Sequence, residues 1–163
     1  MRRFDKVRED QFLRDASGLG DPGDLGRSHA AMPVPRRATG RSAGYDLCTP
    51  VGFELAPGEQ ITVPTGLKVY MEADEVFLIN VRSGQGFRYG LRLMNTQGWI
   101  DADYADNTAN EGHILVALRN EGDRPFVAQP GQAVAQGMFV RYLVTDDDQP
   151  AEETRRGGMG STG

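Results

Sequence analysis

The chain has 163 residues, including 21 glycines and 9 prolines, and carries a formal net charge of −5. The net negative charge argues against binding of nucleic acid through broad electrostatic attraction, and the many turn-forming residues argue against a helical bundle. A single cysteine, Cys48, leaves no intrachain disulfide, and the lack of a signal-peptide core, or of any run near the roughly 18 apolar residues of a membrane span, predicts a soluble, cytoplasmic protein.

Residues 1–31 are expected to form a peripheral N-terminal segment. RRFDKV (residues 2–7) is compatible with an edge strand and REDQFLRD (residues 8–15) with a short helix. The following segment, ASGLGDPGDLGRSHAAM (residues 16–32), contains four glycines and a proline, so we expect a surface loop there.

Apolar and polar residues alternate in short runs from residue 52 onward. GFELAPGEQITVPTGLKVYMEADEVFLINV contains four such runs, and HILVALRN, FVAQ and AVAQGMFVRYLV continue the pattern in the second half. Alternation with a period of two, broken by turn residues, is typical of a β-sandwich or β-barrel. We therefore predict an all-β domain over residues 32–145, without a glycine-rich phosphate loop that opens a helix. Residues 146–163 have too little apolar content to offset the entropy of ordering, so they are expected to be a flexible arm.

Three short polar clusters interrupt the predicted strands. In AGYDL, Asp46 taken alone is expected to be a turn residue that caps backbone amides. In RSG, the side chains of Arg82 and Ser83 with the small Gly84 would form an anion pocket. In AQG, Gln136 lies in the middle of a strand, where a polar side chain needs a partner. Each cluster alone is weak evidence for a site.

The segment GWIDADYADNTANEGHIL, residues 98–115, is apolar at both ends, as the two strands of a β-hairpin would be. Four acidic residues lie between these ends: Asp101, Asp103, Asp106 and Glu111. The start of the segment suggests a calcium loop, but loop position five would be Ala105, and position twelve, which requires a glutamate, would be Gly112. The sequence therefore argues against a calcium loop.

Zinc is also disfavoured, because His29 and His113 stand alone and no thiolate cluster accompanies them. Asp101, at the end of a predicted strand, has the chemistry of a general base. Tyr104 follows three residues later and offers its ring as a platform for a sugar or a base. The other three acids of the segment are expected to be solvated or structural.

Taken in order, AGYDL, RSG, NTQGWIDADY, GQAVAQ and GGMGSTG resemble the five ordered motifs of the homotrimeric dUTP pyrophosphatases (dUTPases), over residues 32–163. NEGHI, ALRN and AQGMF resemble in particular the bacterial and prophage branch, whose third motif carries a longer hairpin. The resemblance implies a jelly-roll-like β-barrel and a homotrimer with active sites at the subunit interfaces. It also implies hydrolysis of dUTP to dUMP and pyrophosphate, which keeps uracil out of DNA and supplies dUMP for thymidylate synthesis.

The resemblance assigns roles to the third motif. Asp101 would activate the water that attacks the α-phosphorus, and the ring of Tyr104 would pack against the deoxyribose, where a 2′-hydroxyl would clash. Asn95 and the backbone that follows, including Gly98 and Ile100, would bind the uracil edge. Cytosine exchanges a donor for an acceptor on that edge, and such a mismatch can cause rejection by roughly 10⁴.

The resemblance also assigns a phosphate site. Arg82, Ser83, Gly84 and Gln136 would line the phosphate chain and stabilise charge on the leaving pyrophosphate. Asp46 would hold Mg²⁺ through water, as is usual for an ion that keeps most of its hydration shell.

The C-terminal arm would close over a neighbouring subunit's site, with the glycine run around Gly160 as its hinge. Arg155 or Arg156 would reach the γ-phosphate together with two hydroxyl side chains, Ser161 and Thr162. The family usually has Phe at position 159, which stacks on uracil, and Met159 is expected to hold the base less rigidly. Ala133 replaces an arginine that is common in the fourth motif, and the arm arginine is usually one residue further from the glycine pair. Which of the two arginines acts therefore stays open.

Two other functions are compatible with parts of this pattern. The related dCTP deaminases use a strand glutamate, but the position that aligns with it here is Ala117, so deamination is disfavoured. Some prophage dUTPase-like proteins bind repressors as regulatory partners, and the longer hairpin or the N-terminal segment would be the contact surface. The retained catalytic residues indicate that such a function would coexist with hydrolysis.

Overall fold

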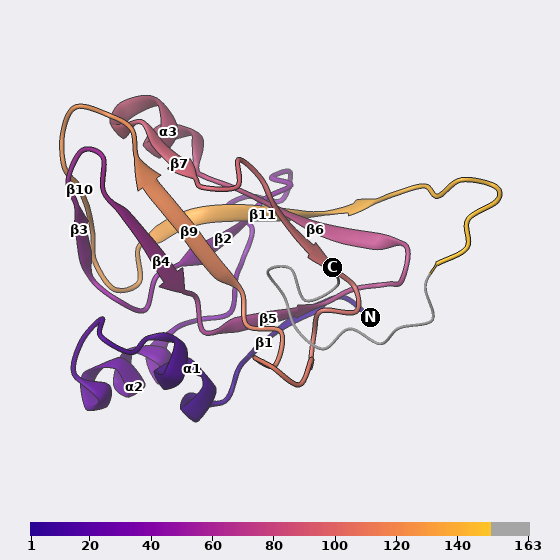
Figure 1. The fold of residues 1–163 in the computed structure, drawn as a ribbon, viewed down its shortest axis with the longest axis horizontal. Coiled ribbons are helices and arrows are strands. Elements are labelled where there is room, and N and C mark those ends of the chain that lie inside the picture. The colour runs from indigo at the N-terminus through magenta and orange to yellow at the C-terminus, as the bar shows by residue number, and fades with distance from the viewer. Residues whose placement is uncertain (151–163) are drawn as a thin grey trace.

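The computed structural model describes residues 1–150, and strands dominate them (Figure 1). The N-terminal segment contributes β1 (Arg3–Lys6), α1 (Glu9–Asp15) and α2 (Pro22–Ala31). The remaining elements, in chain order, are β2 (Tyr45–Cys48), β3 (Phe53–Leu55), β4 (Gln60–Pro64), β5 (Leu67–Tyr70), β6 (Glu75–Asn80), α3 (Ser83–Tyr89), β7 (Leu91–Leu93), β8 (Gly98–Asp101), β9 (Leu115–Asn120), β10 (Phe126–Ala128) and β11 (Ala133–Arg141). No helix in this part of the chain is long and apolar enough to cross a membrane.

Antiparallel sheets surround one hydrophobic core. A four-stranded sheet has the order β2-β11-β6-β8 and a three-stranded sheet the order β4-β9-β7, and two pairs, β1-β5 and β10-β3, complete the fold. Strand β6 shows why the sequence alternates: Phe77 and Ile79 are buried in the core, whereas Leu78 and Asn80 lie on the other face and are half-buried. Each fully buried side chain of this size contributes about 1.5–3 kcal/mol through removal of apolar area from water. The prediction of a mainly β fold is confirmed.

The predicted edge strand and short helix of the N-terminal segment are confirmed as β1 and α1, but the surface loop predicted over residues 16–32 is wrong. Residues 22–31 form α2, because Asp21 caps its N-terminus by accepting hydrogen bonds from the backbone N–H of Gly23 and Asp24 (2.9 and 3.1 Å). Pro22 occupies the first turn, where a missing N–H costs nothing. Burial of Leu25 and His29 against the domain then outweighs the low helix propensity of the glycines.

The predicted hairpin over residues 98–115 is also wrong. Strand β8 pairs with β6, and β9 pairs with β4 and β7, so the two strands belong to different sheets. Residues 102–114 are therefore a connection between sheets. Side-chain hydrogen bonds of Asn107 replace the missing ladder there: its Nδ2 donates to the Tyr104 carbonyl (2.9 Å), and its Oδ1 accepts from the backbone N–H of Ala109 (3.0 Å).

Candidate active site

A cleft of about 420 Å³ opens between β8, β9 and the turn that joins β7 to β8. The five residues predicted from the third motif all line it: Asn95, Gly98, Ile100, Asp101 and Tyr104. Eight further lining residues were not assigned to the site from the sequence: Ile79, Leu93, Met94, Gln97, Trp99, Leu115, Val116 and Ala117. Ala117 is the position that aligns with the deaminase glutamate, so the cleft has a methyl group there instead of a carboxylate.

Asp101 ends β8, where its cross-strand neighbour on β6 is Val76. Its side chain is exposed and lines the cleft, so a substrate-bound water can reach it. Strand β8 is an edge of the four-stranded sheet, and an edge strand has backbone N–H and C=O groups that no neighbouring strand pairs. A planar ring with donors and acceptors on one edge can hydrogen-bond to such groups.

Tyr104 is anchored by its hydroxyl. The hydroxyl donates to the carbonyl oxygen of His113 (3.1 Å) and accepts from Nδ2 of Asn110 (2.8 Å), and only 8% of the residue is exposed. Two hydrogen bonds at the tip of a buried ring restrict its rotation and translation. The ring therefore forms a fixed wall of the cleft rather than a mobile cover.

The turn between β7 and β8 has a strained backbone. Thr96 has φ +62°, a conformation that few residues other than glycine adopt, and Asn95 precedes it at the cleft. Gln97 holds the turn from the other side, because its Nε2 donates to Oδ1 of Asn80 (3.1 Å). This contact links the cleft to the next group of predicted residues, since Asn80 is the cross-strand neighbour of Gln136.

The second group gathers around Gln136 on β11. Gln136 is the neighbour of Asn80 on one side and of Asp46 on the other. Asp46 therefore lies on β2, not in a turn, and its Oδ1 is 3.2 Å from Nε of Arg82. Gly44 allows close packing here, because a Cβ at that position would lie 3.1 Å from Oε1 of Gln136.

Helix α3 begins directly after Arg82, contrary to the expectation that no helix would open at this motif. The first N–H groups of a helix have no intrahelical acceptor, so the amides of Ser83 and Gly84 are available to an anion. A Cβ at Gly84 would meet no atom within 4 Å, which indicates open space for a ligand. Gln85 fixes the helix to β11 through a 2.6 Å bond from Nε2 to the carbonyl of Ala133, the position where the family usually has arginine.

Asp101 of the cleft and Asp46 of the second group lie far apart on the same outer face of the four-stranded sheet. Three cross-strand rows follow one another on this face: Asp46–Gln136–Asn80, Met138–Leu78–Trp99 and Val140–Val76–Asp101. Four residues along a strand span about 13 Å and three strand spacings about 14 Å, so Asp46 and Asp101 are on the order of 20 Å apart. One protomer therefore does not bring Asp101, the predicted general base, close to Asp46 of the predicted phosphate site.

The donor set fits magnesium that is carried mainly by phosphates. Within residues 1–150, no three histidine, cysteine, aspartate or glutamate side chains form a metal-ligand cluster. The single half-buried carboxylate of Asp46, which also pairs with Arg82, is compatible with an ion that keeps its waters and is held mainly by phosphate oxygens. The predicted arm residues Arg155, Arg156, Met159, Gly160, Ser161 and Thr162 lie outside the described residues.

Residues 30–163 match the family model of the dUTPases. The deoxyuridine 5′-triphosphate nucleotidohydrolase of Lactococcus lactis is 45% identical over 136 residues, which cover 83% of this chain and 91% of that protein. The corresponding protein of Photorhabdus laumondii is 36% identical, over 81% of this chain and 88% of its own length. Among solved structures, the dUTPase of Streptococcus mutans superposes with a TM-score of 0.67 at 34% identity, over 88% of this chain and 98% of that chain.

Proposed function

The chain belongs to the dUTPase family and hydrolyses dUTP to dUMP and pyrophosphate, and on this premise we propose how its own residues divide the reaction. The observation that carries the proposal is the convergence of Asn95, Gly98, Ile100, Asp101 and Tyr104 on one cleft.

The cleft binds the nucleoside. The side-chain amide of Asn95 both donates and accepts, and the unpaired edge of β8 between Gly98 and Ile100 supplies further donors and acceptors to uracil. A cytosine in the same place presents its donor and acceptor reversed, which leaves buried groups without partners. Tyr104 packs against the deoxyribose, and its anchored ring leaves no room for a 2′-hydroxyl.

Asp101 orients a water molecule and removes its proton as the water oxygen attacks the α-phosphorus. The bond between the α-phosphorus and the bridging oxygen to the β-phosphorus then breaks, which gives dUMP and pyrophosphate. Arg82, the amides of Ser83 and Gly84, and Gln136 stabilise the charge that moves onto the pyrophosphate. Mg²⁺, when bound to the phosphates and held through water by Asp46, supplies additional neutralisation of that charge.

The residues that bind the phosphates and the residues that line the cleft act together across a subunit interface. About 20 Å separates Asp46 from Asp101 within a protomer, which is too far for both to act on one triphosphate. The row between them is apolar and partly exposed: Trp99 is 65% exposed and Met138 39%. Contact with other copies would cover this row, which supports the homotrimer expected from the family.

A regulatory function through a repressor gains no support from the described residues. The dUTPase of Staphylococcus bacteriophage 80alpha, a phage dUTPase said to control transfer of virulence genes, is only 16% identical, and that likeness shows the fold alone. The connection 102–114, which was expected to serve as a contact surface, is held to the rest of the protomer by ion pairs. Asp106 pairs with Lys68 (2.5 Å), and Glu111 pairs with Arg8 (2.5 Å). These contacts favour a structural function for the acids of this segment.

Release of pyrophosphate from dUTP, dCTP, dTTP and UTP, measured in parallel with Mg²⁺, tests the proposal. We expect rapid release from dUTP only. Comparable release from UTP would contradict the function of Tyr104, and ammonia formed from dCTP would favour deamination. Nucleotide binding without release from any of the four would contradict the proposed division of the reaction.

A further inference from the structure

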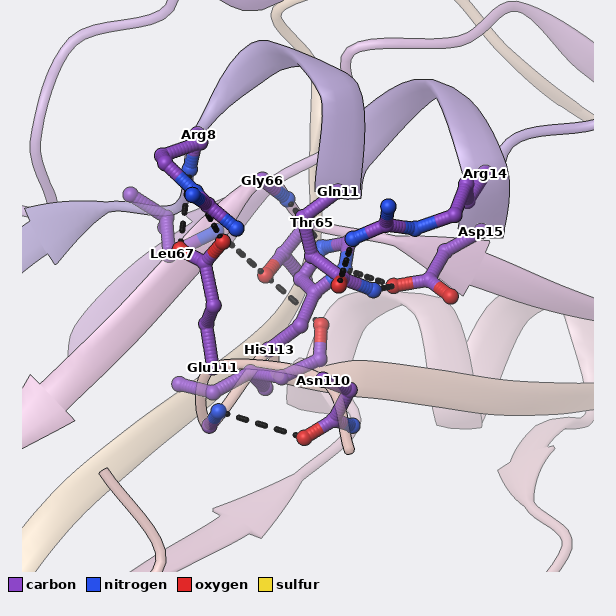
Figure 2. Close-up of polar contacts among 12 residues, drawn as sticks. Arg8, Gln11, Arg14, Asp15, Thr65, Gly66, Leu67, Asn110, Glu111 and His113 are labelled. Atoms are coloured by element: carbon purple, nitrogen blue, oxygen red, sulfur yellow. Dashed lines mark hydrogen bonds and ion pairs between the residues drawn. The ribbon is translucent and has the colours of Figure 1, made fainter. Parts of the chain in front are cut away.

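Helix α1 and the residue before it contact the connection 102–114 through Asp15 and Arg8 (Figure 2). His113, which is fully buried, makes the central contact: its Nδ1 lies 2.5 Å from Oδ2 of Asp15 at the end of α1. Its Nε2 accepts a hydrogen bond from the backbone N–H of Gly66 (2.8 Å), so the ring hydrogen is on Nδ1 and points to the carboxylate. The imidazole is therefore held at both nitrogens.

The backbone of the same residue holds Tyr104. The carbonyl oxygen of His113 accepts the hydrogen bond from the Tyr104 hydroxyl (3.1 Å), so His113 joins α1 on one side to the wall of the cleft on the other. Arg8 forms a second tether, because its Nε and its backbone N both donate to Glu111 (2.5 and 3.2 Å). Glu111 has φ +59°, an unfavourable backbone conformation that persists only when its surroundings fix it.

Asp101 is positioned mainly by the pairing of β8 with β6, where its neighbour is Val76, and this ladder does not involve α1. A backbone hydrogen bond links it to Tyr104, whose N–H donates to the carbonyl of Asp101 (3.1 Å). A loss of the α1 contacts is therefore expected to displace the ring of Tyr104 more than the carboxylate of the general base. This difference separates substrate selection from the chemical step.

We propose that Asp15 and His113 are positioning residues which, through the hydrogen bond from Tyr104 to the His113 carbonyl, set the preference of the enzyme for deoxyribose over ribose. The inference rests on the proposed contact of Tyr104 with the sugar. Asp15 precedes residue 30, where the match to the family model begins. The N-terminal helix thus lies outside the residues that match the family model, and its contact with His113 supports the wall of the cleft that Tyr104 forms.

The test compares kcat and KM for dUTP and for UTP in Asp15→Ala, which removes the acceptor, and Asp15→Asn, which retains a neutral acceptor oxygen. Asp24→Ala is the matched control, because this exposed carboxylate on α2 pairs only locally with Arg27. For Asp15→Ala we expect KM for dUTP to rise about tenfold and the ratio of kcat/KM for dUTP over UTP to fall about tenfold, with kcat for dUTP within about threefold, since small misplacements of a positioning group have effects of this order. Asp15→Asn should recover most of the loss.

Binding is followed separately by the fluorescence of Trp99, the only tryptophan of the chain, which lines the cleft. Titration with a non-hydrolysable dUTP analogue and its UTP counterpart should reproduce the change in preference. Arg8→Ala, which alters an exposed side chain, provides a second variant if Asp15→Ala does not fold, and it should shift the preference in the same direction.

Thermal unfolding and mass in solution are measured for every variant. An Asp15→Ala or Arg8→Ala protein that loses thermal stability but keeps the KM and the dUTP preference of Asp24→Ala would overturn the inference. An equal rise in KM for both nucleotides would overturn it as well. Failure of the proposed function would look different, because the unmodified enzyme itself would then show no preference for dUTP in kinetics or in binding.

Discussion

The stability of the fold is expected to decrease as the pH falls from 6.5 to 5, because of its two histidines. Nε2 of His113 accepts a hydrogen bond from the backbone N–H of Gly66 (2.8 Å), and Nε2 of His29 lies 3.2 Å from the carbonyl oxygen of Gly66. Burial lowers the pKa of His113 by more than Asp15 raises it, with a smaller contribution from Glu111. Burial also lowers the pKa of His29, which faces Lys6 as well as Glu9.

The sign follows from proton linkage. A histidine with a lowered pKa in the folded state stays neutral while the unfolded chain takes up a proton, so its contribution is complete above the unfolded pKa of about 6.5 and is lost as the pH falls toward the folded value. A histidine that stays neutral in the folded protein down to pH 5 lowers the free energy of unfolding by about 1.5–2 kcal/mol between pH 6.5 and pH 5. The two histidines together therefore lower it by at most about 3–4 kcal/mol. The lowered pKa values of Asp106 and Glu111 act only at lower pH.

Urea unfolding followed by far-UV circular dichroism at pH 7.5, 6.5, 5.5 and 5.0 measures this loss. The protomer concentration is held constant, because assembly adds to the apparent stability. His113→Gln keeps an acceptor near the position of Nε2 but cannot be protonated, and His29→Gln is the equivalent change at the second site. Each variant should be less stable at pH 7.5 and should lose part of the pH-dependent decrease, because each removes one of the two titrating groups. The prediction would be refuted if the free energy of unfolding of both variants fell between pH 6.5 and pH 5 by as much as that of the unmodified protein.

Three further results are expected. Asp101→Asn should keep assembly and nucleotide binding while kcat for pyrophosphate release falls by about 10²–10⁴, and a near-normal kcat would remove it as the base. Gly112→Ala should cost about 1–3 kcal/mol in urea unfolding and raise KM, because Gly112 has φ +80° and its Cβ would lie 2.7 Å from the Tyr104 carbonyl oxygen. Met138→Glu should give monomers with little activity in sedimentation and rate measurements, whereas an active assembly would place the interface elsewhere.

The composite arrangement explains why the motifs are dispersed along the chain. In the proposed division, the residues that act on the base and sugar come from β8 and its flanking turns, and the residues that act on the phosphates come from β2, β11 and the start of α3. Each group is stabilised within its own protomer, for example by the bonds from Gln97 to Asn80 and from Gln85 to Ala133. Assembly then requires only that these two preformed groups of residues come into contact across the subunit interface.

The sequence by itself determined the β character of the domain and the chemistry of the site. Alternation along β6 is a local property, and the carboxylate of Asp101 beside Tyr104 is fixed by the chain itself. The β character of such segments was therefore predictable, and the third-motif residues that line the cleft were predictable by resemblance to a family.

Only the tertiary structure decided which segments meet. The apolar ends of residues 98–115 suit a hairpin as well as they suit two strands of different sheets, and only the tertiary structure pairs β8 with β6 and β9 with β4. Local composition likewise favoured a loop over residues 22–31. Helix α2 forms there because the rest of the domain buries its apolar side chains, and local composition does not show that burial. Asp15 and His113 are 98 residues apart in the sequence, and a contact over that separation leaves no periodic signal. It exists because the fold buries His113 beside the half-buried Asp15, and the buried ring nitrogen needs a hydrogen-bonding partner.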